Sequence, residues 1–360
     1  MAPAPQRSSR PGIAGARSIL RCPRNSAIVA GMDYRELGRT GLRVSTLGFG
    51  CGNVGGLLVR GTPAERERAV ARGIELGINY FDTASIYGDG LSEQHLGQAL
   101  RALRAEVLVG TKVRLTPSDL ASIPAAIERS TDESLRRLGM ERVDLMQFHN
   151  PIAVDRRGTS VSAKDLLQTI VPTLARLVER GKLRFFGVTA LGDTPALQEV
   201  VDDARIHTAQ VCLNLLNPTA AVEAPAKFPA QDFGRLLPRC RQRGIGTIII
   251  RVAAGGALSG VETRHPIASP PREPIASGAD YATDVRRARR LQPLVDEGHA
   301  ESLVETSLRF AVGAEGVSTV LLGYSSLDQL EYAAKCVAKG PLPAATLGRL
   351  RELWAGLAGS

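Results

Sequence analysis

The chain alternates short apolar segments with amphipathic segments eight times, and this alternation constrains its fold more than any other feature. Strands whose residues are apolar throughout, each followed by a helix, require a parallel sheet covered by helices, and eight such units close into a barrel. The pattern therefore predicts an α/β fold of the (β/α)8 TIM barrel type. The strands are expected near 47–51, 79–83, 107–112, 144–149, 183–189, 208–214, 246–252 and 317–323, and the helices near 63–77, 92–101, 118–138, 165–180, 194–204, 232–243, 284–296 and 326–338.

Local signals support this division of the chain. Thr62-Pro63-Ala64-Glu65 is a capping box with proline at the first helical position, and Gly77 and Gly181 fall just past predicted helix ends. Before the first barrel strand, two short β-like pieces flank Gly38-Arg39-Thr40-Gly41, which predicts an N-terminal β-hairpin. The remaining loops at the C-terminal face are long, and the longest spans 258–283, where it is expected to form part of a lid.

The chain has no internal domain boundary after residue 31. Residues 1–31 carry five arginines and no acid and lack periodicity. Arginine-rich, acid-free starts resemble organelle transit peptides, but a disordered tail or a mis-assigned start before Met32 fits better, because the patterned chain begins there. We therefore expect residues 1–31 to be an extension and residues 32–360 to form one barrel.

Composition excludes several classes of protein. No apolar run reaches the roughly 18 residues that a membrane helix needs. Of the net charge of +9, five units come from residues 1–31, and the other arginines are mixed with acids, as in Glu65-Arg66-Glu67-Arg68, which argues against nucleic-acid binding. The five cysteines show no CxxC spacing and no clustering with histidine, which argues against a metal site or a disulfide framework and favours a reducing, cytoplasmic location.

Four ionisable residues stand at or just beyond the carboxyl ends of three consecutive predicted strands. Asp82 and Tyr87 belong to the stretch 79–90, Lys112 ends the next strand, and His149 ends the one after it. Active sites of eight-stranded α/β barrels lie at this end. The four residues therefore predict one site for proton transfer.

The chemistry of these residues is consistent with that prediction. A lysine ending a buried strand needs a counter-charge, for which Asp82 is the natural partner. An ammonium beside a phenol stabilises the tyrosinate, which would suit Tyr87 to general acid catalysis. A lone histidine at a strand end is as often structural as functional, but convergence with the other three favours function for His149.

The segment Gly50-Cys51-Gly52-Asn53-Val54-Gly55 matches the GxGxxG dinucleotide fingerprint. That fingerprint requires a helix to open on the glycines, whereas the capped helix here begins only at Thr62. We interpret the match as a false positive that does not indicate a doubly wound fold. The glycines still permit close approach of a ligand to the backbone, so Gly50, Cys51 and Gly52 are candidate cofactor contacts.

From Met32 to its C-terminus the chain resembles the aldo-keto reductase family. The resemblance is carried by Phe81-Asp82-Thr83-Ala84 with Tyr87-Gly88, by Gly110-Thr111-Lys112, and by the run from Ser134 to His149. It implies a barrel that binds a nicotinamide dinucleotide across its strand ends. It also implies that Tyr87 is the proton donor, that Lys112 and Asp82 tune it, and that His149 orients the substrate carbonyl.

Further segments resemble the family's cofactor-binding motifs. Thr189 and Gln210 match the residues that hold the nicotinamide carboxamide, although Ala190 stands where asparagine is usual and Ile250 replaces a stacking aromatic. No lysine or arginine lies within 323–330 to pair with a 2′-phosphate, so NADP is placed only slightly ahead of NAD. The other cofactor contacts that the resemblance implies are Arg251, Gly256, Leu258, Gly323, Ser325 and Gln329.

The resemblance implies an NAD(P)-dependent oxidoreductase that interconverts small-molecule carbonyls and alcohols. Two alternatives remain open: a sugar (aldose) dehydrogenase that works oxidatively with NAD, and a non-turnover subunit that senses the dinucleotide. No metal, nucleic-acid or membrane partner is expected. The substrate, the direction of the reaction and the oligomeric state stay open.

Overall fold

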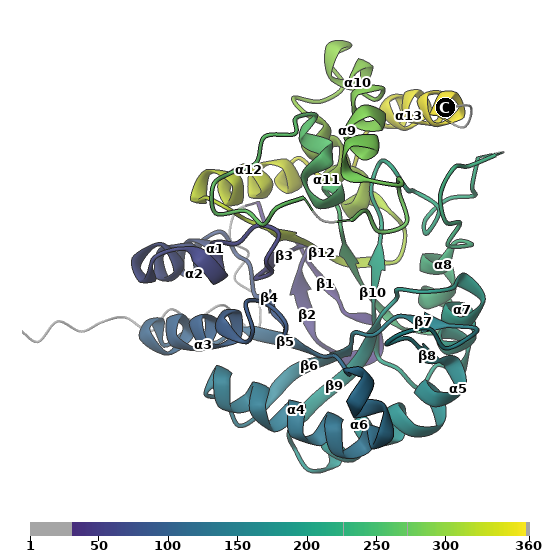
Figure 1. Ribbon diagram of the computed structural model, residues 1–360. Coiled ribbons are helices and arrows are strands. Elements are labelled where there is room, and N and C mark those ends of the chain that lie inside the picture. Colours follow the sequence, from purple (N-terminus) through teal and green to yellow (C-terminus); the bar gives the residue numbers. More distant parts are fainter. Residues whose placement is uncertain (1–30, 226, 272, 358–360) are drawn as a thin grey trace, which may run out of the picture.

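Eight parallel strands close into a barrel in the computed structural model, which describes residues 31–225, 227–271 and 273–357 (Figure 1). The extension expected at residues 1–31 therefore lies almost wholly outside the described residues. The predicted fold is confirmed, and each predicted barrel strand is present with ends shifted by a few residues. In barrel order the strands are β10 (Thr208–Cys212), β11 (Gly246–Ile250), β12 (Val317–Gly323), β3 (Leu47–Gly50), β4 (Tyr80–Asp82), β5 (Leu108–Val113), β6 (Val143–Phe148) and β9 (Leu183–Thr189).

Helices cover the outside of the barrel (Figure 1). The capping box at Thr62 is formed, because its hydroxyl accepts from the Glu65 amide at 3.3 Å and the Glu65 carboxylate accepts from the Thr62 amide at 2.8 Å. The longer helices are α2 (Pro63–Glu75), α3 (Leu91–Leu103), α4 (Ile123–Leu138), α6 (Val171–Glu179), α7 (Thr194–Asp203), α8 (Leu236–Gln242), α9 (Tyr281–Arg289), α11 (Leu303–Gly313), α12 (Leu327–Ala338) and α13 (Ala344–Leu357), and α1 (Leu57–Arg60), α5 (Ala163–Asp165) and α10 (Pro293–Asp296) are short.

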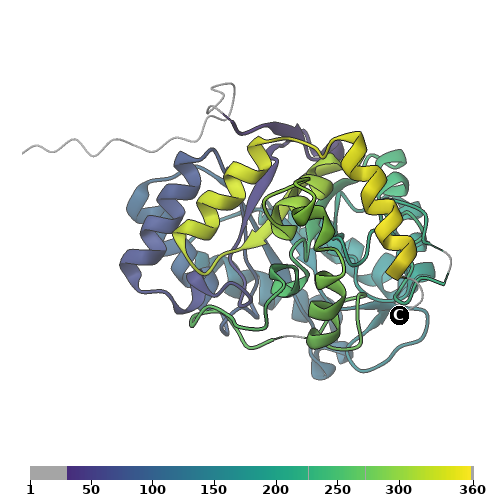
Figure 2. The same cartoon turned by 90° about the horizontal axis from the view of Figure 1, so that it is seen from above.

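The predicted hairpin closes one end of the barrel. Strand β1 (Tyr34–Glu36) pairs antiparallel with β2 (Arg43–Ser45), and a short 3-10 turn joins them. A Cβ on Gly38 of this turn would lie 2.2 Å from the Gly246 amide nitrogen, so only glycine permits so close an approach. The hairpin lies at the end opposite the long loops (Figure 2). Its side chains share a core with residues inside the barrel, namely Leu37, Leu42, Val44, Tyr80, Leu145, Ile248 and Leu321.

One helix was placed wrongly. The segment predicted as a single helix over 284–296 is interrupted before Pro293, where α10 begins, because proline has no amide hydrogen to continue the preceding helix and favours the first position of a new one. The helix that packs against β12 is α11, which no prediction covered. Its start was marked by Ser302, whose hydroxyl accepts from the Glu305 amide at 3.0 Å.

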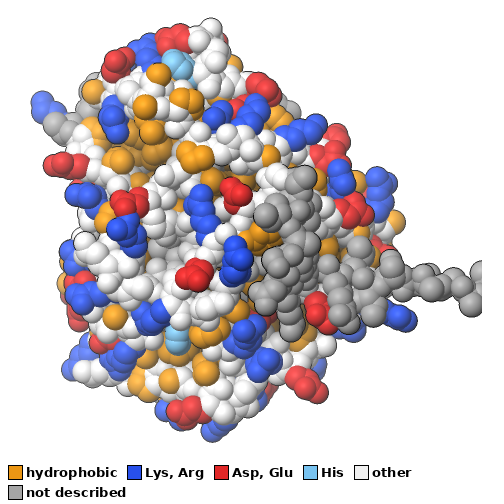
Figure 3. All heavy atoms as spheres, turned by 180° about the vertical axis from the view of Figure 1, so that it is seen from behind, with side chains coloured by type: hydrophobic (Ala, Val, Ile, Leu, Met, Phe, Trp, Pro, Cys, Tyr) orange, Lys and Arg blue, Asp and Glu red, His pale blue; other side chains and the backbone are white. Residues whose placement is uncertain are grey.

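The surface shows no single-sign patch on the face seen in Figure 3, where basic and acidic side chains are interspersed. None of the helices in the described ranges is long and apolar enough to cross a membrane.

Candidate active site

The open end of the barrel is lined by polar side chains from five neighbouring strands. Side chains alternate between the two faces of a strand, so Asp82 at the end of β4 and Lys112 on β5 both point inward. Three further residues complete the ring at the same end: His149 just after β6, Thr189 at the end of β9, and Gln210 on β10. The structure thus brings together side chains separated by up to 128 positions in the sequence.

A buried ion pair lies at the centre of this ring. The Lys112 Nζ atom contacts Asp82 Oδ1 and donates to the Thr83 carbonyl at 2.8 Å. The two side chains are 2% and 4% exposed. Burial acts to lower the pKa of Lys112, but Asp82 and the Tyr87 phenol together outweigh it, so the pKa lies above its ordinary value. The predicted Asp82–Lys112 pair is therefore present and the lysine is charged.

Tyr87 lies in the turn that follows β4. Its ring is half-buried, and the Lys112 Nζ atom lies 4.9 Å from the ring centroid. The turn is possible because Gly88 and Gly90 have positive φ angles of 59° and 90°. A Cβ on Gly52 would lie 3.4 Å from the phenol ring, so the loop after β3 packs directly against it. The phenol therefore sits between the buried ammonium and a glycine-lined surface.

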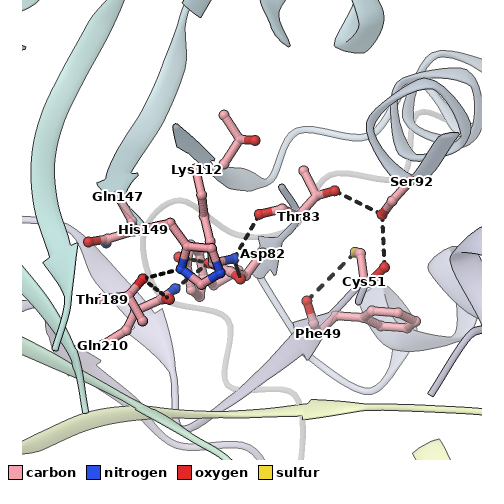
Figure 4. Close-up of polar contacts among 12 residues, drawn as sticks. Phe49, Cys51, Asp82, Thr83, Ser92, Lys112, Gln147, His149, Thr189 and Gln210 are labelled. Atoms are coloured by element: carbon pink, nitrogen blue, oxygen red, sulfur yellow. Dashed lines mark hydrogen bonds and ion pairs between the residues drawn. The ribbon is translucent and has the colours of Figure 1, made fainter. Parts of the chain in front are cut away.

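A chain of hydrogen bonds connects His149 to Asp82 (Figure 4). His149 Nδ1 lies 2.8 Å from Thr189 Oγ1, Thr189 Oγ1 lies 3.1 Å from Gln210 Oε1, and Gln210 Nε2 donates to Asp82 Oδ2 at 2.6 Å. A carboxylate only accepts, so the amide nitrogen of Gln210 must face Asp82 and its oxygen must face Thr189. The Thr189 hydroxyl then donates to Gln210 and accepts from His149 Nδ1–H, which leaves Nε2 as a hydrogen-bond acceptor.

His149 is uncharged at neutral pH. Burial lowers its pKa to about 3, and the positive charges of Lys112, Arg114 and Arg251 act in the same direction. The ring is therefore available as a neutral hydrogen-bonding group, not as a general acid that titrates near pH 7.

Tyr80 is a member of this network that sequence reasoning missed. Its hydroxyl donates to Asp82 Oδ2 at 2.9 Å. Burial, followed by the nearby Asp82 charge, raises the pKa of Tyr80 far above its ordinary value, so it stays a neutral donor. The signal was present, because Tyr80 and Asp82 are two residues apart on one strand and share its inner face.

The other half of the open end is formed by glycine-rich loops after β3, β11 and β12, which are neighbours in the barrel. A Cβ on Gly55 would lie 2.3 Å from the Tyr324 amide nitrogen, and the paired residues Gly50 and Gly323 end adjacent strands. After β11, Gly256 has a φ of 108°, which disfavours other residues. The predicted contacts Gly50, Gly52, Gly256 and Gly323 therefore meet in one backbone-lined region.

The remaining predicted cofactor contacts differ in what they present to this region. The Cys51 and Leu258 side chains are buried in the core, so only their backbone atoms face the loops. Arg251 has a φ of 59°, and one of its guanidinium nitrogens lies 3.0 Å from a Cβ built on Gly255. Ser325 donates to the Gly55 carbonyl at 2.6 Å, and its amide donates to Gln329 Oε1 at 2.8 Å.

The long segment after β11 crosses the loop after β3, as expected for a lid. Arg264 donates to the Gly255 carbonyl at 2.6 Å and to the Val54 carbonyl at 3.4 Å, which ties the two glycine loops together. Arg60 donates to the Ile267 carbonyl at 2.6 Å. Sequence reasoning missed Arg264, because its loop has no periodic pattern. Its Nε atom is buried and has no hydrogen-bond partner among the described residues.

The open end of the barrel thus combines two kinds of lining, one of ionisable side chains and one of backbone. A charged lysine, a phenol and a neutral imidazole lie beside a region of close-approaching backbone crossed by an arginine. Within the described ranges no three His, Cys, Asp or Glu side chains lie close enough to hold a metal ion.

Comparisons with known proteins agree with this geometry. The sequence profile described as "Aldo/keto reductase family" matches residues 46–355. The chain is 28% identical to L-galactose dehydrogenase of Arabidopsis thaliana over 309 residues, which are 83% of this chain and 86% of that protein. It is 26% identical over 328 residues to a probable voltage-gated potassium channel subunit beta of the same species, covering 86% and 93% of the two chains.

A solved structure shares the fold. The holo form of an aldo-keto reductase from Bacillus halodurans superimposes with a TM-score of 0.67 at 24% identity, over 89% of this chain and 96% of that one. The profile covers most of the chain, including the ends of all eight barrel strands. The chain therefore belongs to the aldo/keto reductase family of oxidoreductases.

Proposed function

We propose that this protein is an NAD(P)-dependent oxidoreductase that interconverts carbonyl compounds and alcohols, with Tyr87 as the general acid and base. The observation that carries the proposal is the buried network in which Asp82 holds a charged Lys112 4.9 Å from the Tyr87 ring centroid, while His149 stands in the same ring. Each member also belongs to one of the motifs through which the sequence resembles the family.

The glycine-lined half fits a dinucleotide. Family members generally use NAD(P)H, and the buried, unpartnered Arg264 Nε–H beside the glycine loops suits a phosphate oxygen as acceptor. Gly50, Gly52, Gly256 and Gly323 would allow such a group to approach the backbone, and Ser325 and Gln329 would lie at its far end. Thr189 and Gln210 would hold the carboxamide. The bound nicotinamide would supply or accept the hydride.

The residues of the network divide the work of proton transfer. Lys112 stabilises the tyrosinate that Tyr87 becomes when it gives its proton to the carbonyl oxygen, and Asp82 keeps Lys112 charged. Gln210 Oε1 could accept a hydrogen bond from a carboxamide, and the Thr189 hydroxyl could then donate to His149 Nδ1 instead. In that state the neutral His149 would carry its proton on Nε2 and could donate a hydrogen bond to the carbonyl oxygen beside Tyr87. In the oxidative direction the tyrosinate accepts the hydroxyl proton.

The side chains near α12 favour NAD over NADP, which revises the order expected from the family. Within the described chain, the first turn of α12 carries Asp328 and no basic residue, and Glu331 follows it. Arg72, which reaches this helix, is paired with Glu331 at 2.7 Å and with Glu75 at 3.1 Å. A 2′-phosphate would meet acidic groups there, whereas a ribose hydroxyl could donate to one.

A second candidate is an aldose dehydrogenase that works oxidatively. In the network as it stands, His149 Nε2 is an acceptor, and a sugar hydroxyl next to the reacting carbon could donate to it. L-galactose dehydrogenase of Arabidopsis thaliana, named for the oxidation of a sugar, is a relative over most of the chain. A channel subunit is also a relative, so a non-turnover subunit remains a third candidate, which the intact set of Asp82, Tyr87, Lys112 and His149 disfavours.

Replacement of Tyr87 by phenylalanine should lower kcat by ~10²–10⁴-fold, because general acid catalysis contributes about that much. The steady-state rate of reduction, measured with a panel of aldehydes, gives kcat. The dissociation constant of the dinucleotide should stay unchanged. Tyr332→Phe is the matched control, since its hydroxyl contacts Ser302 away from the site. Near-wild-type turnover of Tyr87→Phe would contradict the proposed mechanism.

The buried neutral state of His149 should make the protein less stable in acid. Its pKa is about 3 in the folded state against an ordinary value of 6.5, so between these pH values the unfolded chain binds more protons and the free energy of unfolding falls as the pH falls. Urea unfolding at pH 7 and pH 4 should show a smaller loss for His149→Gln than for the wild type. Between pH 7.5 and 8.5, the unfolding free energies of the wild type and of His149→Gln should change with pH by the same amount. Equal losses of unfolding free energy in acid for the two proteins would contradict the assignment of a buried, neutral His149.

The oxidised and reduced forms of NAD should bind more tightly than those of NADP, by about tenfold or roughly 1.4 kcal/mol. Equilibrium titration followed by the fluorescence of NADH and NADPH measures this without turnover. Asp328→Lys should narrow or reverse the preference, because it replaces a like charge by a partner for the 2′-phosphate. Tighter binding of NADPH to the wild type would overturn the preference.

The two enzymatic candidates differ in their preferred reaction. We expect kcat/KM for reduction of simple aldehydes with NADH to exceed kcat/KM for oxidation of aldoses with NAD. Measurements at one pH with both cofactor forms, on matched aldehydes and aldoses, decide between them. A larger value for aldose oxidation would instead identify the sugar dehydrogenase, and no turnover in either direction would favour the sensing subunit.

A further inference from the structure

Arg114 occupies a position at the open end that neither the family motifs nor the network uses. Strand β5 is in register with β6 so that Lys112 pairs with Gln147 and Val113 with Phe148. The His149 amide donates to the Val113 carbonyl at 2.9 Å, so the alignment continues one step further and sets Arg114 beside His149. Arg114 thus lies just beyond the end of β5, two residues after Lys112.

The guanidinium of Arg114 has no hydrogen-bond or ion-pair partner among the residues that the structure describes. Its side chain is exposed. Lys112, two residues earlier on β5, is neutralised by Asp82. An exposed arginine without an ion-pair partner in the described chain is available to a ligand.

A cavity of about 320 Å³ opens beside this arginine. It lies between the loop that carries Tyr87, the segment after β5 and one face of α4, and its wall includes Ser85, whose hydroxyl donates to the Lys112 carbonyl at 3.2 Å. The two other arginines of its wall are already paired, Arg129 with Asp119 and Arg137 with the buried Glu93, each at 2.6 Å. Among the described lining residues, Arg114 is thus the free positive charge.

The field of Arg114 reaches the reacting centre. After burial and Lys112, it is the next cause that lowers the pKa of His149, followed by Arg251. Ser85 and Asp89 of the cavity wall stand on either side of Tyr87 in the chain, so a group bound in the cavity would lie beside the loop that carries Tyr87.

On this basis we propose that Arg114 is a specificity-determining residue that binds an anionic substituent, a carboxylate or a phosphate, on the substrate whose carbonyl lies at Tyr87 and His149. The inference rests on the proposed function and names its substrate class. Arg114 pairs with carboxylate or phosphate oxygens through its planar fork of donors. Asp89, an exposed carboxylate in the same wall without an ion-pair partner in the described chain, opposes the anion and sets an upper limit on its affinity.

The test compares matched charged and neutral aldehydes with the wild-type holoenzyme and with Arg114→Gln. The pairs are 4-oxobutanoate with 4-oxobutanamide, and glyceraldehyde 3-phosphate with glyceraldehyde, so the two arms separate carboxylate from phosphate recognition. We expect the wild type to prefer the charged member of at least one pair, and Arg114→Gln to raise its KM by about 10- to 100-fold with kcat nearly unchanged. The neutral members should react alike in both proteins.

Three further variants sharpen the result. Arg114→Lys should recover part of the preference, and Asp89→Asn should lower the KM of the charged substrates a few-fold by removing a like charge. Arg205→Gln, which removes an arginine that is paired with Asp203 outside this cavity, should leave the preference in place. A wild type without preference, or an Arg114→Gln variant that affects charged and neutral substrates equally, would overturn the proposal.

A binding measurement separates this proposal from the catalytic one. Calorimetric titration of 4-oxobutanoate into the enzyme with oxidised cofactor, where the aldehyde is not reduced, reports affinity alone. The affinity should fall in Arg114→Gln and persist in Tyr87→Phe. Loss of turnover in Tyr87→Phe with affinity retained would support both proposals, whereas retained turnover there with lost affinity in Arg114→Gln would leave only the anion site standing. Equal affinities of the wild type and Arg114→Gln for 4-oxobutanoate would overturn the proposal that Arg114 binds the anion.

Discussion

The buried contact between Asp82 and Lys112 is the interaction on which the open end of the barrel depends. Neither charge is tolerable alone at this depth, because removing one partner of a buried pair leaves an uncompensated charge at a cost of roughly 3–5 kcal/mol. The pair is further held by Tyr80 and Gln210, which both donate to Asp82 Oδ2, and by the Thr83 carbonyl, which accepts a second hydrogen bond from Lys112. These contacts keep the Lys112 ammonium charged beside the Tyr87 phenol.

The same contact organises the rest of the ring. Because Asp82 can only accept, it orients the amide of Gln210, which orients the hydroxyl of Thr189, which in turn sets the proton on the imidazole of His149. A change at one member therefore alters hydrogen-bond direction at the others. The opposite half of the open end has few such constraints, because its glycines present backbone and its lid is held by arginine contacts to carbonyl oxygens.

Much of this arrangement was predictable from the sequence, for physical reasons. Apolar strands, capping boxes and glycines after helices are local signals that can be read from the sequence. The rule that active sites of these barrels lie at the carboxyl ends of the strands predicts that Asp82, Lys112 and His149 are neighbours. Tyr80 was missed because it was taken as one more apolar residue of a buried strand. Arg264 was missed because contacts of an aperiodic loop depend on its path. The free state of Arg114 also needed the structure, since only the fold shows which arginines are already paired.

The hairpin that closes the barrel has a practical consequence. Gly31, the first residue that the structure describes, lies beside Ala338 with its Cβ position 3.5 Å away, and the chain then enters β1 at the closed end. Gly31 itself therefore lies on the side away from the loops that carry the site (Figure 2). A tag fused directly to Gly31, in place of the residues before it, would start from the closed end of the barrel and leave the open end accessible to small molecules.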